Sequence, residues 1–269
     1  MARDPHPFYI PPESFRPDGS VRFPEEEARH LLRVIRLRAG DTCRVTDGMG
    51  GIYVVRLQGT LEALDGIRLE ARHESRPAPE IELGFPLLHN RARMEWMLEK
   101  AVEVGADAQV PILWRRNVGE MTPAARRRWE RMLREAMKQS ERSWLPDLRD
   151  AEPPELPGGE ARVILADPEG EAALPPMAGA AGAAGAARGS PVRLLIGPEG
   201  GASPEERERL RVAGAIFWSL GPTRLRAETA AIVGLHRLRQ ELRRGDGPGG
   251  GAGGVDDDQR ERGTTDAVA

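Results

Sequence analysis

Apolar and polar residues follow a helical period in four segments of this chain. In residues 94–102 apolar residues recur at i, i+3, i+4, i+7 and i+8, and Gly105 stands where a left-handed cap ends a helix. Thr122 before a proline has the residue type of an N-cap, so a second helix is expected from there. The Ser-Pro-Glu-Glu sequence at 203–206 matches a capping box. A final amphipathic helix is predicted over residues 228–243.

Short apolar runs separate these helices and predict strands. They read "RVILADP", "VRLLIGP" and "AIFWSLGP" in the second half of the chain, and a further strand is expected at residues 110–114. Strands that alternate with helices are typical of a parallel α/β sheet.

The first 75 residues predict a β-rich unit. Alternation on either side of a glycine-containing turn at 47–51 is a hairpin signal. Ahead of it, "EEEARHLLRVIRLRAGD" predicts a short helix that runs into a strand, with its arginines on an exposed edge. A proline-containing joint follows near 76–80. We therefore expect one domain at 1–75, a second at 76–244 and a disordered acidic tail at 245–269.

Composition excludes several classes of protein. The 269-residue chain has no run of about 18 apolar residues, so no transmembrane helix is expected. Residues 1–12 lack the basic and apolar regions of a secretory signal, and Cys43 is the single cysteine. We therefore expect a cytoplasmic protein without a disulfide framework. No histidine has a partner at metal-ligand spacing, so no metal is expected.

Charge is unevenly distributed along the chain. The net charge is −3, but residues 245–269 carry six acidic and two basic residues, so the remainder is slightly positive. Of the 39 basic residues only Lys100 and Lys138 are lysines. Guanidinium groups suit bidentate contacts to phosphates and bases, although an arginine excess also reflects genome composition. RNA binding and an ordinary solvated surface both remain open interpretations.

The sequence "LLIGPEGGASPEE" is the first candidate for chemistry. Gly197, Gly200 and Gly201 lie between a predicted strand and a helix start, where backbone amides are able to point at a ligand. Neither the P-loop nor the dinucleotide fingerprint is present. Pro198 removes an amide donor and Glu199 repels an anion. The loop therefore predicts a ligand that is neutral or cationic at its near edge, or a turn with a purely geometric role.

A second glycine-proline turn, "SLGPTRLRAETAA", also leaves a predicted strand and enters a helix. In open parallel sheets ligands bind at the carboxyl ends of strands, so the two turns are expected to line one pocket. Glu228 and Thr229 are read equally well as capping residues of the final helix.

Several motifs occur together in a specific order. "MLEKAVEVGADAQVPI", "AMKQSER", "IGPEGGASPEE" and "SLGPTRLRAETAAIVGL", behind "HLLRVIRLRAGD", resemble the RsmE family of small-subunit ribosomal RNA uridine N3-methyltransferases over residues 5–243. Ala202, where the family usually has phenylalanine, and "RRNV" at 115–118 depart from its pattern. The resemblance implies an α/β SPOUT methyltransferase domain with a C-terminal trefoil knot, preceded by a PUA-like β-barrel.

The resemblance also implies a cofactor, a substrate and an assembly. The family acts as a homodimer that binds S-adenosylmethionine in the knot and modifies 16S ribosomal RNA of the small ribosomal subunit. Carried onto this chain, the cofactor-binding residues are Ile196, Gly197, Pro198, Glu199, Gly200, Gly201, Ser219, Leu220, Gly221, Leu225, Ala227, Thr229 and Ala230.

Methylation at uridine N3 requires the loss of an imide proton. We expect Arg226 to stabilise the developing negative charge, and Glu228 is the candidate base. Candidate RNA contacts are Arg33, Arg36, Arg38, Gln139 and Arg142, with surface ion pairs as the alternative role of these arginines. Two other functions stay open: a SPOUT-class ribose 2′-O-methyltransferase, and a non-catalytic RNA-binding or assembly protein. The N-terminal barrel and the "LRAETA" turn favour the base methyltransferase.

Overall fold

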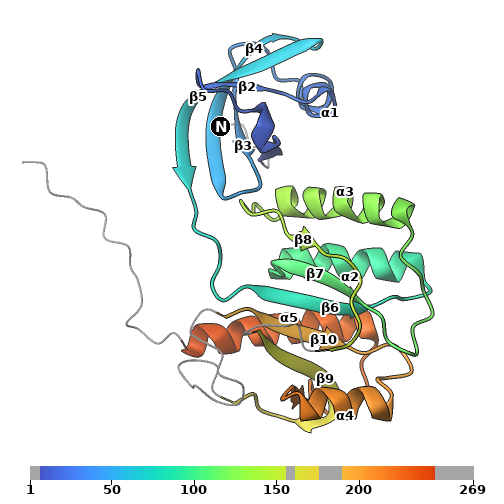
Figure 1. Ribbon diagram of the computed structural model, residues 1–269. Helices are drawn as coiled ribbons and strands as arrows, with labels where there is room; N and C mark the ends of the chain where they lie inside the picture. The colour runs from blue at the N-terminus through green and yellow to red at the C-terminus, as the bar shows by residue number, and fades with distance from the viewer. Residues whose placement is uncertain (1–6, 156–160, 176–189, 246–269) are drawn as a thin grey trace, which may run out of the picture.

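Two β-sheets organise the chain, one in each half (Figure 1). The computed structural model describes residues 7–155, 161–175 and 190–245. The predicted acidic tail lies outside these residues from position 246 onward.

The N-terminal sheet contains the predicted hairpin. Its strands follow the order β1-β3-β4-β5-β2 and pair antiparallel, except that β1 is parallel to β3. Across the turn between β3 and β4, Val45 faces Tyr53, and Gly48 has a φ of 72°, a conformation that favours glycine. The strands are β1 (Phe8–Tyr9), β2 (Ser20–Arg22), β3 (Thr42–Thr46), β4 (Gly51–Thr60) and β5 (Ala63–His73).

The segment between β2 and β3 differs from the prediction. After the 3-10 turn η1 (Pro12–Ser14) and strand β2, α1 (Glu25–Arg29) continues directly into η2 (His30–Ile35), a π-helical turn. No strand follows the helix before β3, so that prediction is wrong. The reason is local: Leu31 is buried in the N-terminal core, and Arg36 ends the helix in the left-handed region, with a φ of 66°.

The C-terminal sheet is parallel, as predicted. Every adjacent pair of strands in the order β11-β9-β10-β6-β7-β8 runs in the same direction. β7 begins two residues before the predicted strand, and β9 continues beyond the apolar run that predicted it. The strands are β6 (Ile81–Pro86), β7 (Ala108–Ile112), β8 (Asp147–Leu148), β9 (Arg162–Glu171), β10 (Val192–Ile196) and β11 (Ile216–Trp218).

In the described part of the chain four helices accompany this sheet, and the predicted caps are present. Gly105 has a φ of 110°, the Thr122 hydroxyl accepts a hydrogen bond from the Ala125 amide, and Ser203 and Glu206 form a complete capping box. Within the described residues no helix is long and apolar enough to cross a membrane. The helices are α2 (Arg91–Val104), α3 (Pro123–Gln139), α4 (Pro204–Val212) and α5 (Ala227–Gly245).

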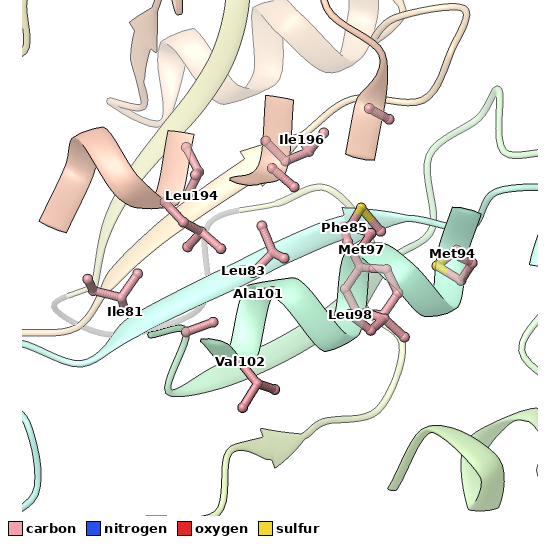
Figure 2. Packing of buried hydrophobic residues seen from close by; sticks show 14 of the residues in the cluster. Ile81, Leu83, Phe85, Met94, Met97, Leu98, Ala101, Val102, Leu194 and Ile196 are labelled. Atoms are coloured by element: carbon pink, nitrogen blue, oxygen red, sulfur yellow. The ribbon is translucent and has the colours of Figure 1, made fainter. Parts of the chain in front are cut away.

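The helices divide between the two faces of the sheet. Buried residues of α2, α3 and α5 share one cluster with β6 and β10, whereas Leu210 of α4 packs in a separate cluster with Leu165 and Leu195. Figure 2 shows the first cluster, in which Leu83 of β6 lies close to residues of α2. Burial of one such leucine contributes about 1.5–3 kcal/mol. This packing holds the strands in register and so positions the turns at their ends.

The segment after α3 joins the two halves of the molecule. The Ser143 carbonyl accepts hydrogen bonds from the Gly50 amide (3.0 Å) and the Thr46 hydroxyl (3.2 Å), and the Leu145 amide donates to the Gly48 carbonyl (2.8 Å). The predicted domain boundary falls in the connection between β5 and β6. Contacts distant in sequence therefore fix the hairpin turn against the second unit.

The sheet order creates the edge where the candidate site lies. β10 is placed between β9 and β6, and β9 lies between β11 and β10. The carboxyl ends of three neighbouring strands therefore open on one side of the sheet. Strand order alone does not establish how the chain threads between these elements, so the trefoil knot stays a prediction.

Candidate functional site

The two glycine-proline turns meet at this edge and line a single pocket. The pocket has a volume of about 1060 Å³ and receives residues from the turn after β10, the turn after β11 and the start of α5. Of the predicted cofactor residues all but Ser219 and Thr229 lie in its wall, namely Ile196, Gly197, Pro198, Glu199, Gly200, Gly201, Leu220, Gly221, Leu225, Ala227 and Ala230.

The first turn is held by its own backbone and by the helix that follows. The Gly201 amide donates to the Pro198 carbonyl (2.8 Å), and Gly201 has a φ of 71°, which favours glycine. Ser203 then begins α4, and the buried carboxylate of Glu206 accepts from the amides of Ser203 and Arg115, both at 2.7 Å. This carboxylate therefore links the turn to the chain that leaves β7.

The family departures noted in the sequence both lie beside this turn. Ala202 lines the pocket and packs against the apolar cluster under α4. Arg116, within the "RRNV" segment, donates to the Gly200 carbonyl at 2.6 Å. The segment that differs from the family pattern therefore holds the first turn in this chain.

A third wall of the pocket was not predicted from the sequence. Residues 165–169, within β9, line it together with Arg207 and Arg211 of α4. Arg207 pairs with Asp167 (3.3 Å) and Glu169 (2.8 Å). The available signal was "ADP" after an apolar run, but only the sheet order places this strand end beside the other two.

Arg93, which sequence reasoning also missed, connects the two turns. Its guanidinium donates to both carboxylate oxygens of Glu228, each at 2.7 Å, and to the Glu199 carboxylate at 2.8 Å. Glu199 belongs to the first turn, and Glu228 lies in the first turn of α5. These hydrogen bonds lower the pKa of Glu228 below its usual value, since they favour its ionised form.

The two predicted catalytic residues differ in their surroundings. Arg226 lines the pocket and is exposed, and its guanidinium has no hydrogen-bond partner within the described residues. Glu228 is buried and is not part of the pocket wall. A carboxylate that is paired in this way is a weak base, so the geometry favours Arg226 as the group that faces a substrate.

The predicted RNA contacts separate into two groups. Arg33, Arg36 and Arg38 are exposed around the end of η2, and Gln139 is exposed at the end of α3. The structure contradicts the prediction for Arg142, whose guanidinium donates to the Val102 and Ala106 carbonyls and to Asp107. Arg142 is directed into the protein because these acceptors at the end of α2 need donors.

The remaining candidate residues have structural roles. Cys43 is buried in the N-terminal core, as expected for a small apolar residue. Among the described residues no three His, Cys, Asp or Glu side chains are grouped so that they could hold a metal ion.

Comparison with known proteins identifies both units of the chain. A family model described as an RNA methyltransferase domain matches residues 75–239, and one described as an RNA methyltransferase PUA domain matches residues 23–63. The fold is therefore, as predicted, a PUA-like domain followed by a SPOUT methyltransferase domain.

Relatives with assigned names match most of the chain. Ribosomal RNA small subunit methyltransferase E from Synechocystis is 31% identical over 84% of this chain and 74% of its own length. Its namesake from Bacillus subtilis is 29% identical, with coverages of 82% and 91%.

Solved structures show the same architecture. A probable rRNA methyltransferase from Porphyromonas gingivalis has a TM-score of 0.72 and 31% identity, covering 87% of this chain and 98% of its own. The ribosomal RNA small subunit methyltransferase E from Neisseria gonorrhoeae bound to S-adenosyl methionine has a TM-score of 0.72 and 23% identity, with coverages of 88% and 97%. Together with the family models, these relatives show that this chain belongs to the ribosomal RNA small subunit methyltransferase E family of RNA methyltransferases.

Proposed function

We propose that this protein methylates N3 of a uridine in 16S ribosomal RNA of the small ribosomal subunit, with S-adenosylmethionine as the methyl donor. The observation that supports this most strongly is the shared pocket of the two glycine-proline turns, with Arg226, which has no hydrogen-bond partner among the described residues, in its wall. The family to which the chain belongs supplies the reaction class.

The pocket suits a cofactor that combines an apolar ring system with charged groups of both signs, because carboxylates and five arginines line it. Ile196, Leu220 and Leu225 provide apolar surface for an adenine ring, and Glu199 and Asp167 place carboxylates at the wall. The carboxylates attract a cationic group of the ligand, and the arginines attract a carboxylate group of it. These residues would hold S-adenosylmethionine, which supplies an electrophilic methyl group on a sulfonium centre when bound. The relative from Neisseria gonorrhoeae, described as bound to that cofactor, supports this assignment.

Arg226 has the central role in the proposed reaction. Loss of the N3 proton leaves a negative charge shared by the uracil nitrogen and its carbonyl oxygens, and a guanidinium beside them stabilises that anion. The proton passes to solvent. Glu228 would act as the base only after leaving Arg93, so we assign it a positioning role instead.

The exposed arginines of the first domain are proposed to hold the RNA backbone. Replacement of Arg33, Arg36 and Arg38 by alanine is expected to weaken binding to the small subunit and to reduce the slope of log K against log salt by about 2–3, since each lost phosphate contact removes about 0.7–0.9. Filter binding at salt concentrations from about 50 to about 200 mM measures this slope. Arg72, exposed on β5, provides the matched control. An unchanged slope in the triple variant would contradict the assignment.

Primer extension on ribosomal RNA tests the proposed reaction. N3 methylation blocks Watson-Crick pairing and stops reverse transcriptase, so one stop in 16S RNA should disappear when the gene is deleted and return on complementation. A stop that persists in the deletion strain would refute the assignment. Loss of a ribose 2′-O-methyl group instead would identify the alternative enzyme of the same class.

Cofactor binding separates an enzyme from a non-catalytic RNA-binding protein. Calorimetry with S-adenosylmethionine is expected to show binding to the purified protein, and an absence of binding would favour an assembly role.

We further propose that the protein acts as a homodimer in the cytoplasm, where ribosomal subunits occur. Light scattering on the purified protein tests the dimer, and a monomeric mass would contradict it.

A further inference from the structure

We propose that Arg93 is a positioning residue that clamps the two turns of the pocket together, and that Glu228 serves this clamp. The inference deepens the proposed function, because the clamp shapes the site assigned to S-adenosylmethionine. The clamp consists of Arg93, Glu199 and Glu228.

The clamp joins three segments that are distant in the sequence. Arg93 lies 135 residues from Glu228 and 106 residues from Glu199, yet its guanidinium reaches both carboxylates at 2.7–2.8 Å. Arg93 is carried by α2, whose inner face is buried against β6 and α5. The rigid part of the domain thus supplies a single cation to both irregular turns.

Arg93 does not stabilise α2, the helix that carries it. Asn90 caps α2 by accepting a hydrogen bond from the Arg93 amide, so Arg93 occupies the third helical position. Glutamate or glutamine at this position would complete a capping box, and the helix dipole opposes a cation in the first turn. The partners of the Arg93 side chain, rather than the stability of α2, therefore account for this residue.

The two links of the clamp differ in strength. The side chain of Glu228 is 10% exposed and accepts two parallel hydrogen bonds, whereas that of Glu199 is 56% exposed and accepts one. Bidentate pairing that is shielded from water is the stronger kind. The pKa of Arg93 is raised, chiefly by its hydrogen bonds to Glu228, which agrees with this order.

The first turn also has supports that the start of α5 lacks. Arg116 donates to the Gly200 carbonyl at 2.6 Å, and Arg224 donates to the Glu199 carbonyl at 3.2 Å. Among the described side chains, Arg93 alone donates to the Glu228 carboxylate. Loss of Arg93 should therefore release the start of α5 more than the first turn.

Hydrogen exchange in the free protein tests the clamp without any ligand. Arg93→Ala and Glu228→Gln are each expected to speed amide exchange about tenfold or more in residues 219–230, with a smaller effect in 197–202. Arg91→Ala is the matched control, because Arg91 lies in the same helical turn and pairs only with the neighbouring Glu95 among the described residues. Exchange in Arg93→Ala that equals wild type would overturn the clamp.

Cofactor affinity supplies the second measurement. Arg93→Ala and Glu228→Gln are each expected to raise the Kd for S-adenosylmethionine about tenfold, and the double variant should bind no more weakly than Arg93→Ala, because Arg93→Ala already removes the link to Glu228. Arg93→Lys should recover part of the affinity, and Glu199→Gln should lose about two- to threefold. Losses that multiply in the double variant would contradict the proposed coupling.

The hydrogen-exchange and cofactor-affinity experiments distinguish a failure of the clamp from a failure of the proposed function on which it rests. If the wild-type chain binds no S-adenosylmethionine, the proposed function fails, and the exchange arm still decides the clamp. If a urea titration shows that Arg93→Ala is unfolded, the exchange experiment uses Glu228→Gln in its place, because that substitution keeps the size of the side chain. Unchanged exchange in Glu228→Gln then overturns the proposal.

Discussion

Replacing Arg226 with alanine is expected to lower kcat for RNA methylation about 100- to 1,000-fold, the usual cost of removing one donor that stabilises transition-state charge. The Arg226 guanidinium lies in the pocket wall, exposed and without a partner among the described residues. Because it is not needed to hold the turns, the Kd for S-adenosylmethionine should change by only about twofold, in keeping with an interaction made chiefly in the transition state. Single-turnover methylation of small subunits, combined with calorimetry, measures both quantities.

Two control variants test whether the effect of Arg226 on kcat depends on its position in the pocket and on its charge. Arg243, exposed near the end of α5 and absent from the pocket wall, should tolerate alanine with no loss of activity. Arg226→Lys should keep the charge but lose the planar, forked donor, and recover only part of the rate. Wild-type kcat in Arg226→Ala would require another residue to stabilise the uracil anion.

The second large effect concerns stability. Replacing Glu82 with leucine is expected to reduce the free energy of unfolding by about 3–5 kcal/mol, because the buried guanidinium of Arg193 loses its buried partner and keeps, among the described residues, the partly exposed Glu152. Arg193 lies in β10, in the interior of the parallel sheet, and is 1% exposed. Its Nε donates to Glu82 at 2.8 Å, and Glu82 also pairs with Arg149 at 2.5 Å. Urea unfolding of the purified variants gives the free energies.

A double variant shows whether the loss of stability comes from the buried charge of Arg193. Glu82→Leu combined with Arg193→Met should recover most of the stability, since an apolar pair of similar volume can replace a buried ion pair. The remaining partners, Arg149 and Glu152, are partly exposed and can turn to water. Glu241→Ala, which removes an exposed ion pair in α5, should cost less than about 1 kcal/mol. A Glu82→Leu variant as stable as wild type would contradict the buried-pair interpretation.

The local features of the fold were predictable because their causes are local. The cap of α3 at Thr122, the capping box at Ser203 and the left-handed Gly105 each depend on residues within one helical turn. The β3–β4 hairpin depends on glycines in its turn. The one local error, a strand after α1, arose because η2 and the left-handed Arg36 have no strong signal in the sequence.

The candidate site was predictable only in part. Sheet topology explains why two glycine-proline turns far apart in the chain share one pocket, and the sequence contained both turns. It did not reveal that residues 165–169 of β9 form the third wall, because that wall depends on strand order. Arg142, expected on the surface, is instead bound to carbonyls at the end of α2.

The sequence by itself determined the type and order of most helices and strands, the caps of three helices, and the two glycine-proline turns. It did so because backbone geometry, capping and charge sign are properties of neighbouring residues. Only the tertiary structure decided which charged side chains form ion pairs between distant segments. Arg93 joins Glu199 and Glu228 across more than one hundred residues, whereas Arg226 has no hydrogen-bond partner among the described residues. Ion-pair partners depend on how distant elements pack, and no local pattern encodes that.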